Sequence, residues 1–145
     1  MILPAVPGQY PRLLAIWESA VHATHDFLRR EDFDYYKARM PEYFGMVRLF
    51  VYRDVTTGTL TGFLGITDKQ VQMLFVDEAA RGKGVGKQLL EHAVTLGCDA
   101  VDVNEQNIQA IGFYLHQRFE ITGRAATDGA GKPYPLLHLK KVSAS

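Results

Sequence analysis

Three glycines and three cationic side chains occur within the heptapeptide RGKGVGK at residues 81–87. Glycine lets backbone N–H groups converge on an anion, because it reaches unusual φ values and leaves the approach unobstructed. A helix that begins just after such a loop adds unpaired N–H groups and the positive end of its dipole. The heptapeptide therefore predicts a phosphate-binding loop for a nucleotide, a dinucleotide or coenzyme A, with a ligand-free surface turn as the alternative.

Two of these ligand classes require residues that the loop does not have. A nucleoside-triphosphate loop reads GxxxxGK[ST], but Arg81 stands where its first glycine belongs and Gln88 where its hydroxyl residue belongs. A dinucleotide loop reads GxGxxG, which would need glycine at Lys87, or glycine or alanine at Leu89. Neither pattern fits, and the pattern that remains is R-x-x-G-x-G.

This remaining pattern follows the apolar run LFV at residues 74–76 and precedes the segment NIQAIGFY at residues 107–114. Together these segments resemble the GCN5-related N-acetyltransferase (GNAT) family, in its small bacterial type. That family has the loop Q/R-x-x-G-x-G/A after a strand often written LYV, and then a helix with N-x-x-A-x-x-F-Y. One departure is Glu78, where the family often has proline.

The resemblance implies acetyl-CoA as cosubstrate, with no metal. It implies that backbone amides of residues 82–86 hold the pyrophosphate, and that the strand at 74–76 pairs with the pantetheine arm, which Asn107 also borders. The residues implied to bind the cofactor are Leu74, Phe75, Val76, Arg81, Gly82, Lys83, Gly84, Val85, Gly86, Lys87 and Asn107.

Tyr114 matches the tyrosine that, in this family, protonates the departing thiolate after an amine attacks the thioester directly. A phenol has a reference pKa near 10 and a thiol one near 8.5, so a neutral tyrosine can donate to the sulfur with a modest mismatch. We therefore expect Tyr114 to be the general acid. A core aromatic side chain is the structural alternative.

The general base stays open, because Gln72 occupies the position where many family members carry a glutamate. His22 and His25 are candidate substitutes, as base or as acceptor-binding groups, since histidine titrates near neutral pH. Their spacing places both on one face of a helix if the helix at residues 10–24 continues. The resemblance also puts Gln72, Asn104 and Glu105 beside the acceptor, although Glu105 could equally be a solvated surface carboxylate.

Hydrophobic periodicity predicts the elements that position these residues. Apolar side chains at three- and four-residue spacing predict a helix at 10–24, a helix directly after the glycine loop and a helix at 107–116, where Ile108, Ile111 and Leu115 share a face. Residues 25–46 show no clean period, and we expect only a short helix at 32–39. Turn residues separate the predicted strands, at 2–5 (an edge strand), 47–54, 59–68, 71–76, 100–104, 119–125 and 135–141.

This order predicts an α+β fold, with a mixed, mostly antiparallel central sheet flanked by helices. The resemblance implies that the sheet is splayed between the strands at 71–76 and 100–104. At 145 residues the chain fits a single domain, residues 1–145.

Composition limits the partners and the compartment. Sixteen basic side chains balance sixteen acidic ones, so nothing indicates binding to nucleic acid or to an anionic membrane. Cys98 is the only cysteine, which excludes an internal disulfide and a cysteine-rich metal cluster and favours a reducing, cytoplasmic setting. His22 and His25 have no evident third ligand, so we expect no metal site. No apolar run is long enough for a membrane span.

The resemblance thus implies an N-acetyltransferase that moves the acetyl group of acetyl-CoA to a primary amine by direct attack. The alternative is a non-catalytic acetyl-CoA sensor, which Gln72 favours because it removes the usual base. A small metabolite, a peptide N-terminus, a lysine side chain and an antibiotic all remain possible acceptors. Dimers are common in the family, so a homodimer is one expected assembly.

Overall fold

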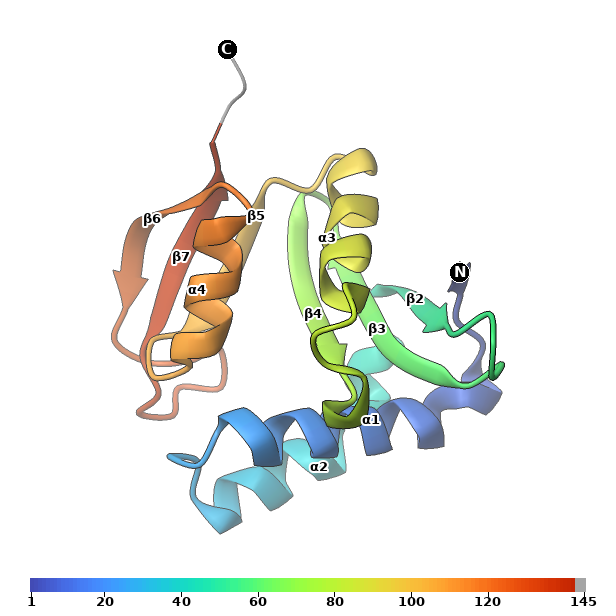
Figure 1. Cartoon of the computed structure of the whole chain (residues 1–145). Coiled ribbons are helices and arrows are strands. Elements are labelled where there is room, and N and C mark those ends of the chain that lie inside the picture. Colours follow the sequence, from blue (N-terminus) through green and yellow to red (C-terminus); the bar gives the residue numbers. More distant parts are fainter. Residues whose placement is uncertain (143–145) are drawn as a thin grey trace.

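The computed structural model describes residues 1–142, which fold around one seven-stranded sheet with helices on both faces (Figure 1). The strand order is β1-β2-β3-β4-β5-β7-β6, and every neighbouring pair is antiparallel except the parallel pair β4 and β5. The strands are β1 (Ile2–Pro4), β2 (Arg48–Arg53), β3 (Leu60–Thr67), β4 (Gln70–Val76), β5 (Ala100–Asn104), β6 (Phe119–Ala125) and β7 (Leu136–Lys141). The predicted mixed, mostly antiparallel sheet is confirmed.

Four α-helices and two short 3₁₀ turns cover this sheet. They are η1 (Pro7–Gln9), α1 (Tyr10–Thr24), α2 (Arg30–Phe44), η2 (Glu78–Ala80), α3 (Val85–Thr95) and α4 (Ile108–His116). One core lies between α1, α2 and the sheet, and includes Leu13, Phe44 and Phe63. The second core, which includes Leu89 and Leu139, lies on the opposite face under α3 and α4. No helix within residues 1–142 combines the length and apolar character that crossing a membrane requires.

Two helices differ from their sequence-based predictions. Helix α2 spans Arg30–Phe44 rather than 32–39, and its burial is limited to Asp32, Phe33, Met40 and Phe44, which explains the weak apolar period. In α4 only part of the predicted apolar face is covered, because Ile111 packs against the second core whereas Ile108 is 79% exposed and Leu115 45% exposed. The side chain that α4 buries is Tyr114. The tyrosine on α4 therefore faces the interior of the protein.

The sheet opens between β4 and β5, as expected. These strands pair only at Gln70 with Ala100 and at Val71 with Val101, and then diverge (Figure 1). The pairing of β3 with β4 shifts register between Gly65 and Ile66 and leaves Gln72 as an extra residue in β4. Such a bulge bends a strand and increases its twist, which accounts for the direction in which β4 leaves β5.

Helix α1 is tied to the turn that follows β4 through the carboxylate of Asp77. That carboxylate accepts hydrogen bonds from Arg12 Nη2 at 2.8 Å, from Ser19 Oγ at 3.3 Å and from the Ala79 N–H at 3.0 Å. Burial raises the pKa of Asp77, but the hydrogen bonds from Ala79 and Arg12 outweigh burial, so that the pKa lies below its usual value. Asp77 thus fixes the start of the segment that carries the glycine loop.

We predict that Asp77→Ala lowers the free energy of unfolding by about 1–3 kcal/mol, because Arg12 and Ser19 lose their common acceptor. The folded-state pKa of this carboxyl is depressed, so its contribution is present near neutral pH and is lost as the pH falls through that pKa. Urea unfolding of the variant and the wild type at pH 7 and pH 3 checks both points. Asp34→Ala is the control, since Asp34 is exposed and pairs only with Arg30 one helical turn away.

Candidate active site

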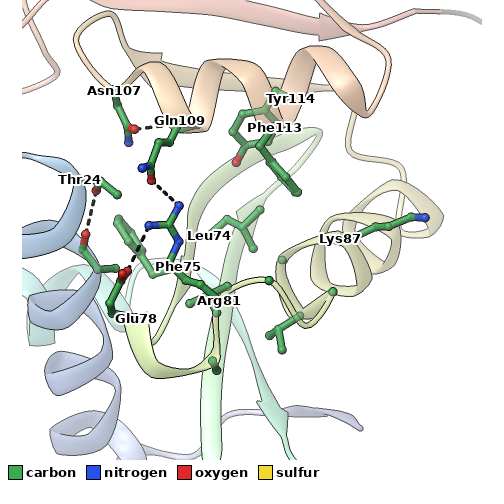
Figure 2. Close-up of a pocket in the computed structure, with 18 of the residues that line it drawn as sticks. Thr24, Leu74, Phe75, Glu78, Arg81, Lys87, Asn107, Gln109, Phe113 and Tyr114 are labelled. Carbon is green, nitrogen blue, oxygen red and sulfur yellow. Dashed lines mark hydrogen bonds and ion pairs between the residues drawn. The ribbon is translucent and has the colours of Figure 1, made fainter.

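A pocket of about 730 Å³ opens where β4 and β5 diverge (Figure 2). Its walls come from β4, the glycine loop, the start of α3, α4 and the end of α1. The lining residues include Ala20, Thr24, His25, Leu74, Phe75, Val76, Glu78, Arg81, Gly82, Gly84, Val85, Gly86, Lys87, Asn107, Gln109, Phe113 and Tyr114. All predicted cofactor residues except Lys83 therefore border one cavity. Lys83 is exposed on the loop and is not among the lining residues.

The glycine loop has the backbone geometry that an anion site needs. Gly82 and Gly84 have φ values of 78° and 80°, in the left-handed region that other residues rarely adopt. Gly84 is the N-cap of α3, which begins at Val85. The N–H groups of the first turn of a helix have no partner within it, so those of α3 face outward beside the pocket. The loop and the helix start together have the geometry that a phosphate site requires.

Arg81 lies between the loop and α4 (Figure 2). Its Nη1 is 3.2 Å from Glu78 Oε2, and its Nη2 donates a hydrogen bond to Gln109 Oε1 on α4. Glu78, at the position where the resemblance led us to expect proline, is thus the counter-ion of Arg81. Lys87 adds a second, exposed cation on α3.

Tyr114 projects from α4 toward β4, and its side chain is only 6% exposed (Figure 2). Its ring packs edge-on against Phe113 and Phe119, with centroid distances of 5.1 Å and 5.6 Å. Burial raises the pKa of the phenol, because the phenolate would lose its hydration. The hydroxyl therefore stays protonated at neutral pH and can donate a proton or a hydrogen bond within the pocket.

The structure separates the two candidate histidines. Helix α1 ends at Thr24, so His25 leaves the helix and lines the pocket, with its Nδ1 2.7 Å from Thr24 Oγ1. His22 stays on the exposed side of α1, 3.6 Å from Glu18, and does not line the pocket. Because the helix does not continue past Thr24, His22 and His25 do not share a helical face. Burial lowers the pKa of His25, which keeps the imidazole neutral at pH 7 and able to accept a proton.

The three residues expected beside the acceptor are engaged elsewhere. Gln72 is exposed on the bulge of β4 and donates to Thr67 Oγ1 at 2.8 Å. Asn104 accepts a hydrogen bond from the Gln106 N–H at 2.9 Å, and Glu105 forms an ion pair with Arg124 at 2.8 Å. None of the three lines the pocket.

The pocket also contains the predicted residue Asn107 and two residues that the sequence did not indicate. Asn107 caps α4, because its Oδ1 accepts a hydrogen bond from the Ala110 N–H at 3.1 Å, and it also borders the pocket. Gln109 and Thr24 were not predicted, and no local pattern marks them. Within residues 1–142, no group of three or more histidine, cysteine, aspartate or glutamate side chains is placed to hold a metal ion.

Comparisons with known proteins agree on one family. The model of the acetyltransferase (GNAT) domain matches residues 45–121. The peptidyl-lysine N-acetyltransferase YjaB of Salmonella typhimurium is 42% identical over 135 residues, which are 88% of each chain. Its namesake in Escherichia coli is 42% identical over 137 residues, covering 91% of this chain and 90% of the relative. The solution structure of apo-form YjaB from Escherichia coli superposes with a TM-score of 0.91 at 37% identity, covering 99% of this chain and 98% of the other.

Proposed function

Since this chain belongs to the GNAT family of acetyltransferases, we propose that it transfers the acetyl group of acetyl-CoA to the side-chain amine of a lysine in a peptide or protein. The observation that carries the proposal is the single pocket that joins the glycine loop to the hydroxyl of Tyr114. The lysine acceptor is supported by relatives at 42% identity that are named for it. The pocket is lined by β4 on one side and by α4 on the other, so we propose that residues 1–145 act as one catalytic unit.

The donor would be held mainly by backbone groups. The loop at 82–86 and the first turn of α3 offer N–H groups to the pyrophosphate, and Arg81 and Lys87 add positive charge. Beyond Val71, the edge of β4 that faces β5 has no strand partner among residues 1–142. Its peptide groups at residues 74–76 are thereby available to the amides of the pantetheine arm. This arrangement supports the expected division between a phosphate end and a thioester end of the pocket.

The transfer forms one bond and breaks another. The amine nitrogen bonds to the carbonyl carbon, the carbon–sulfur bond breaks, the nitrogen loses a proton and the sulfur gains one. We assign the proton donor to Tyr114, which is buried and neutral. A lysine amine must first lose its own proton, which costs about 4.6 kcal/mol at pH 7 from its reference pKa of about 10.4. We propose that His25 accepts this proton, either directly or through a water molecule.

A peptide assay tests the function. The purified protein is mixed with acetyl-CoA and a peptide that carries one lysine and a blocked N-terminus, and the free thiol is measured. We expect thiol release with this peptide and none when arginine replaces the lysine, with mass spectrometry locating the acetyl group on the lysine Nζ. Coenzyme A binding without thiol release from a broad panel of amines would instead establish the sensor alternative. Thiol release only from peptides with a free N-terminus would show that the acceptor is the α-amine of a peptide rather than a lysine side chain.

We predict that His25→Gln lowers kcat at pH 7 and that this difference disappears in acid. The pKa of His25 lies below its ordinary value of 6.5, so the wild type loses its base only when the pH falls through that lowered pKa. The ratio of wild-type to variant kcat at saturating peptide, measured from pH 5 to pH 9, should therefore decline toward one at the acid end. His22→Gln is the matched comparison and should follow the wild type. A ratio that does not change with pH would remove His25 from the proton transfer.

A further inference from the structure

The two parts of the sheet are joined by strand pairing at one end only. The first half comprises β1–β4 with α1–α3, and the second half comprises β5, β7 and β6 with α4. Between them, β4 and β5 pair at Gln70 with Ala100 and at Val71 with Val101, and no further. The pocket opens at the other end of this gap, with His25 and Phe75 on the first half and Asn107 and Tyr114 on the second. Contacts other than strand pairing must therefore set the width of the gap at the open end.

A cluster of five polar side chains bridges the halves at that open end, and we name it the Asp32 junction. It joins Asp32 and Tyr36 of α2 to Asp128, Lys132 and Tyr134 of the segment between β6 and β7. Lys132 Nζ lies 2.8 Å from one carboxylate oxygen of Asp32, and the Tyr134 hydroxyl donates to the other. The Tyr36 hydroxyl donates to Asp128. Every one of these contacts crosses from the first half to the second.

The centre of the junction is shielded from water. As whole residues, Asp32 and Tyr134 are 8% and 5% exposed. The hydrogen bonds from Lys132 and Tyr134 hold the pKa of Asp32 below its usual value, so the carboxylate is ionised at neutral pH. Charge-assisted hydrogen bonds are stronger than neutral ones, and removing one partner of a buried pair leaves the other charge without compensation. The junction is therefore a firm connection.

The junction touches both walls of the pocket. On the first half, the ring of Tyr134 packs 6.1 Å from that of Phe27, which packs 5.2 Å from His25. On the second half, the carbonyl of Pro135, next to Tyr134, accepts a hydrogen bond of 2.8 Å from the Glu105 N–H. Glu105 lies two residues before the pocket residue Asn107. Displacing Tyr134 would thus shift the imidazole and the opposite wall together.

Other contacts cross the open end on the opposite face of the sheet. Phe113 of α4 lies close to Gly86 at the start of α3, since a Cβ built on Gly86 would be 3.7 Å from its ring. Arg81 reaches Gln109 there, through a guanidinium side chain that is 39% exposed. Exposed contacts of this kind contribute little to rigidity. On the face that carries α1 and α2, the polar bridges within residues 1–142 come from the junction and from the Arg29 N–H, which donates to Tyr134 at 3.2 Å.

We propose that the Asp32 junction fixes the width of the gap at the thioester end, and so restricts the acyl group to a short chain and holds His25 in place. This inference rests on the proposed acetyl transfer. Asp32 and Tyr134 are positioning residues, because they act through Phe27 and the backbone. If they are released, the two walls can separate, and a longer acyl chain then fits where the acetyl group is held.

Acyl-chain preference tests the proposal. The kcat/KM values of wild type, Asp32→Asn and Tyr134→Phe are measured with acetyl-, propionyl- and butyryl-CoA and one lysine peptide. We expect kcat/KM for acetyl-CoA to fall by up to about 10²-fold, because a displacement of about 1 Å between reacting groups can have such an effect. We also expect the butyryl-to-acetyl ratio to rise. Asp34→Asn, an exposed acid on the same helix, should keep the wild-type ratio. If the junction variants fold and keep the wild-type ratio of butyryl-CoA to acetyl-CoA kcat/KM, the proposal is overturned.

A distance measurement tests the proposed role of the junction without relying on catalytic activity. Nitroxide labels on Ala23→Cys of α1 and on Ala126→Cys, which follows β6 at the open end, occupy exposed positions and report the separation of the halves there. Cys98 is buried and is replaced by alanine in this background. We expect a narrow distance distribution that broadens on adding Tyr134→Phe, or Lys132→Met if Tyr134→Phe does not fold. An unchanged distribution would refute the junction, whereas a wild type that transfers no acetyl group to any amine would refute only the proposed function.

Discussion

Replacing Tyr114 with phenylalanine is expected to lower kcat by about 10²- to 10⁴-fold, the range that a positioned proton donor contributes. The phenol is buried on α4, and burial raises its pKa, so it is in the donating form throughout the working pH range. Phenylalanine keeps the packing against Phe113 and Phe119. The affinity for coenzyme A should consequently stay near that of the wild type. Steady-state kinetics and calorimetric titration with coenzyme A measure the two quantities separately.

The control for this substitution is Tyr10→Phe, which removes a phenol that packs against Phe44 in the other core, with ring centroids 5.1 Å apart. It should leave both kcat and coenzyme A affinity unchanged. A wild-type kcat in Tyr114→Phe would show that another group or water protonates the sulfur. A large loss of coenzyme A affinity would instead assign Tyr114 to donor binding.

The double substitution Gly82→Ala with Gly84→Ala is expected to weaken coenzyme A binding by about 30- to 1,000-fold. Each glycine has a φ near 80°, where a side chain costs about 1–2 kcal/mol. The two substitutions together add about 2–4 kcal/mol of backbone strain to the conformation that binds the pyrophosphate. If the loop relieves this strain by leaving that conformation, the same free energy is lost from binding, which corresponds to that change in Kd. The N–H groups of the loop would then no longer converge on the pyrophosphate.

Two comparisons isolate the backbone effect. Gly8→Ala is the control, because a Cβ on Gly8 meets no atom within 4 Å and its φ is not in the left-handed region. Titration with pantetheine, which lacks phosphates, should give the same affinity for the double variant and the wild type. An unchanged Kd for coenzyme A in a folded double variant would contradict the assignment of this loop to the phosphates.

Strands and helices with one regular apolar face were predictable from the sequence. Helix α1 was predicted at its observed bounds, and the three strands before the glycine loop were correct within a few residues. Helix α2 was predicted only over 32–39, because just four of its residues are buried and one of them is the charged Asp32. On α4 only Ile111 of the predicted apolar stripe packs against the core, since periodicity identifies a stripe without showing which side the rest of the protein covers. Tyr114, rather than Ile108 or Leu115, is the residue that α4 buries.

In the candidate site, too, some features were predictable from the sequence and others were not. The conformation of the glycine loop was predictable, because glycines act through the backbone of their own segment, and Gly82, Gly84 and the start of α3 lie where their spacing indicated. The positions of the side chains expected beside the acceptor were not. Gln72 lies on a bulge that turns it away from the pocket, and His22 is separated from His25 by the end of α1. These orientations depend on strand register and on where a helix ends.

The amino-acid sequence alone determined the family resemblance, the order of the elements and the loop that is expected to hold the donor. Each of these depends on residues close together in the chain, whose steric and hydrogen-bonding limits act locally. Only the tertiary structure decided which histidine borders the pocket and how the open end of the sheet is held. The pairing of Asp32 with Tyr134 joins residues that lie 102 positions apart. Neither residue carries a local signal for the other, because their contact exists only after the sheet has placed α2 beside the β6–β7 segment.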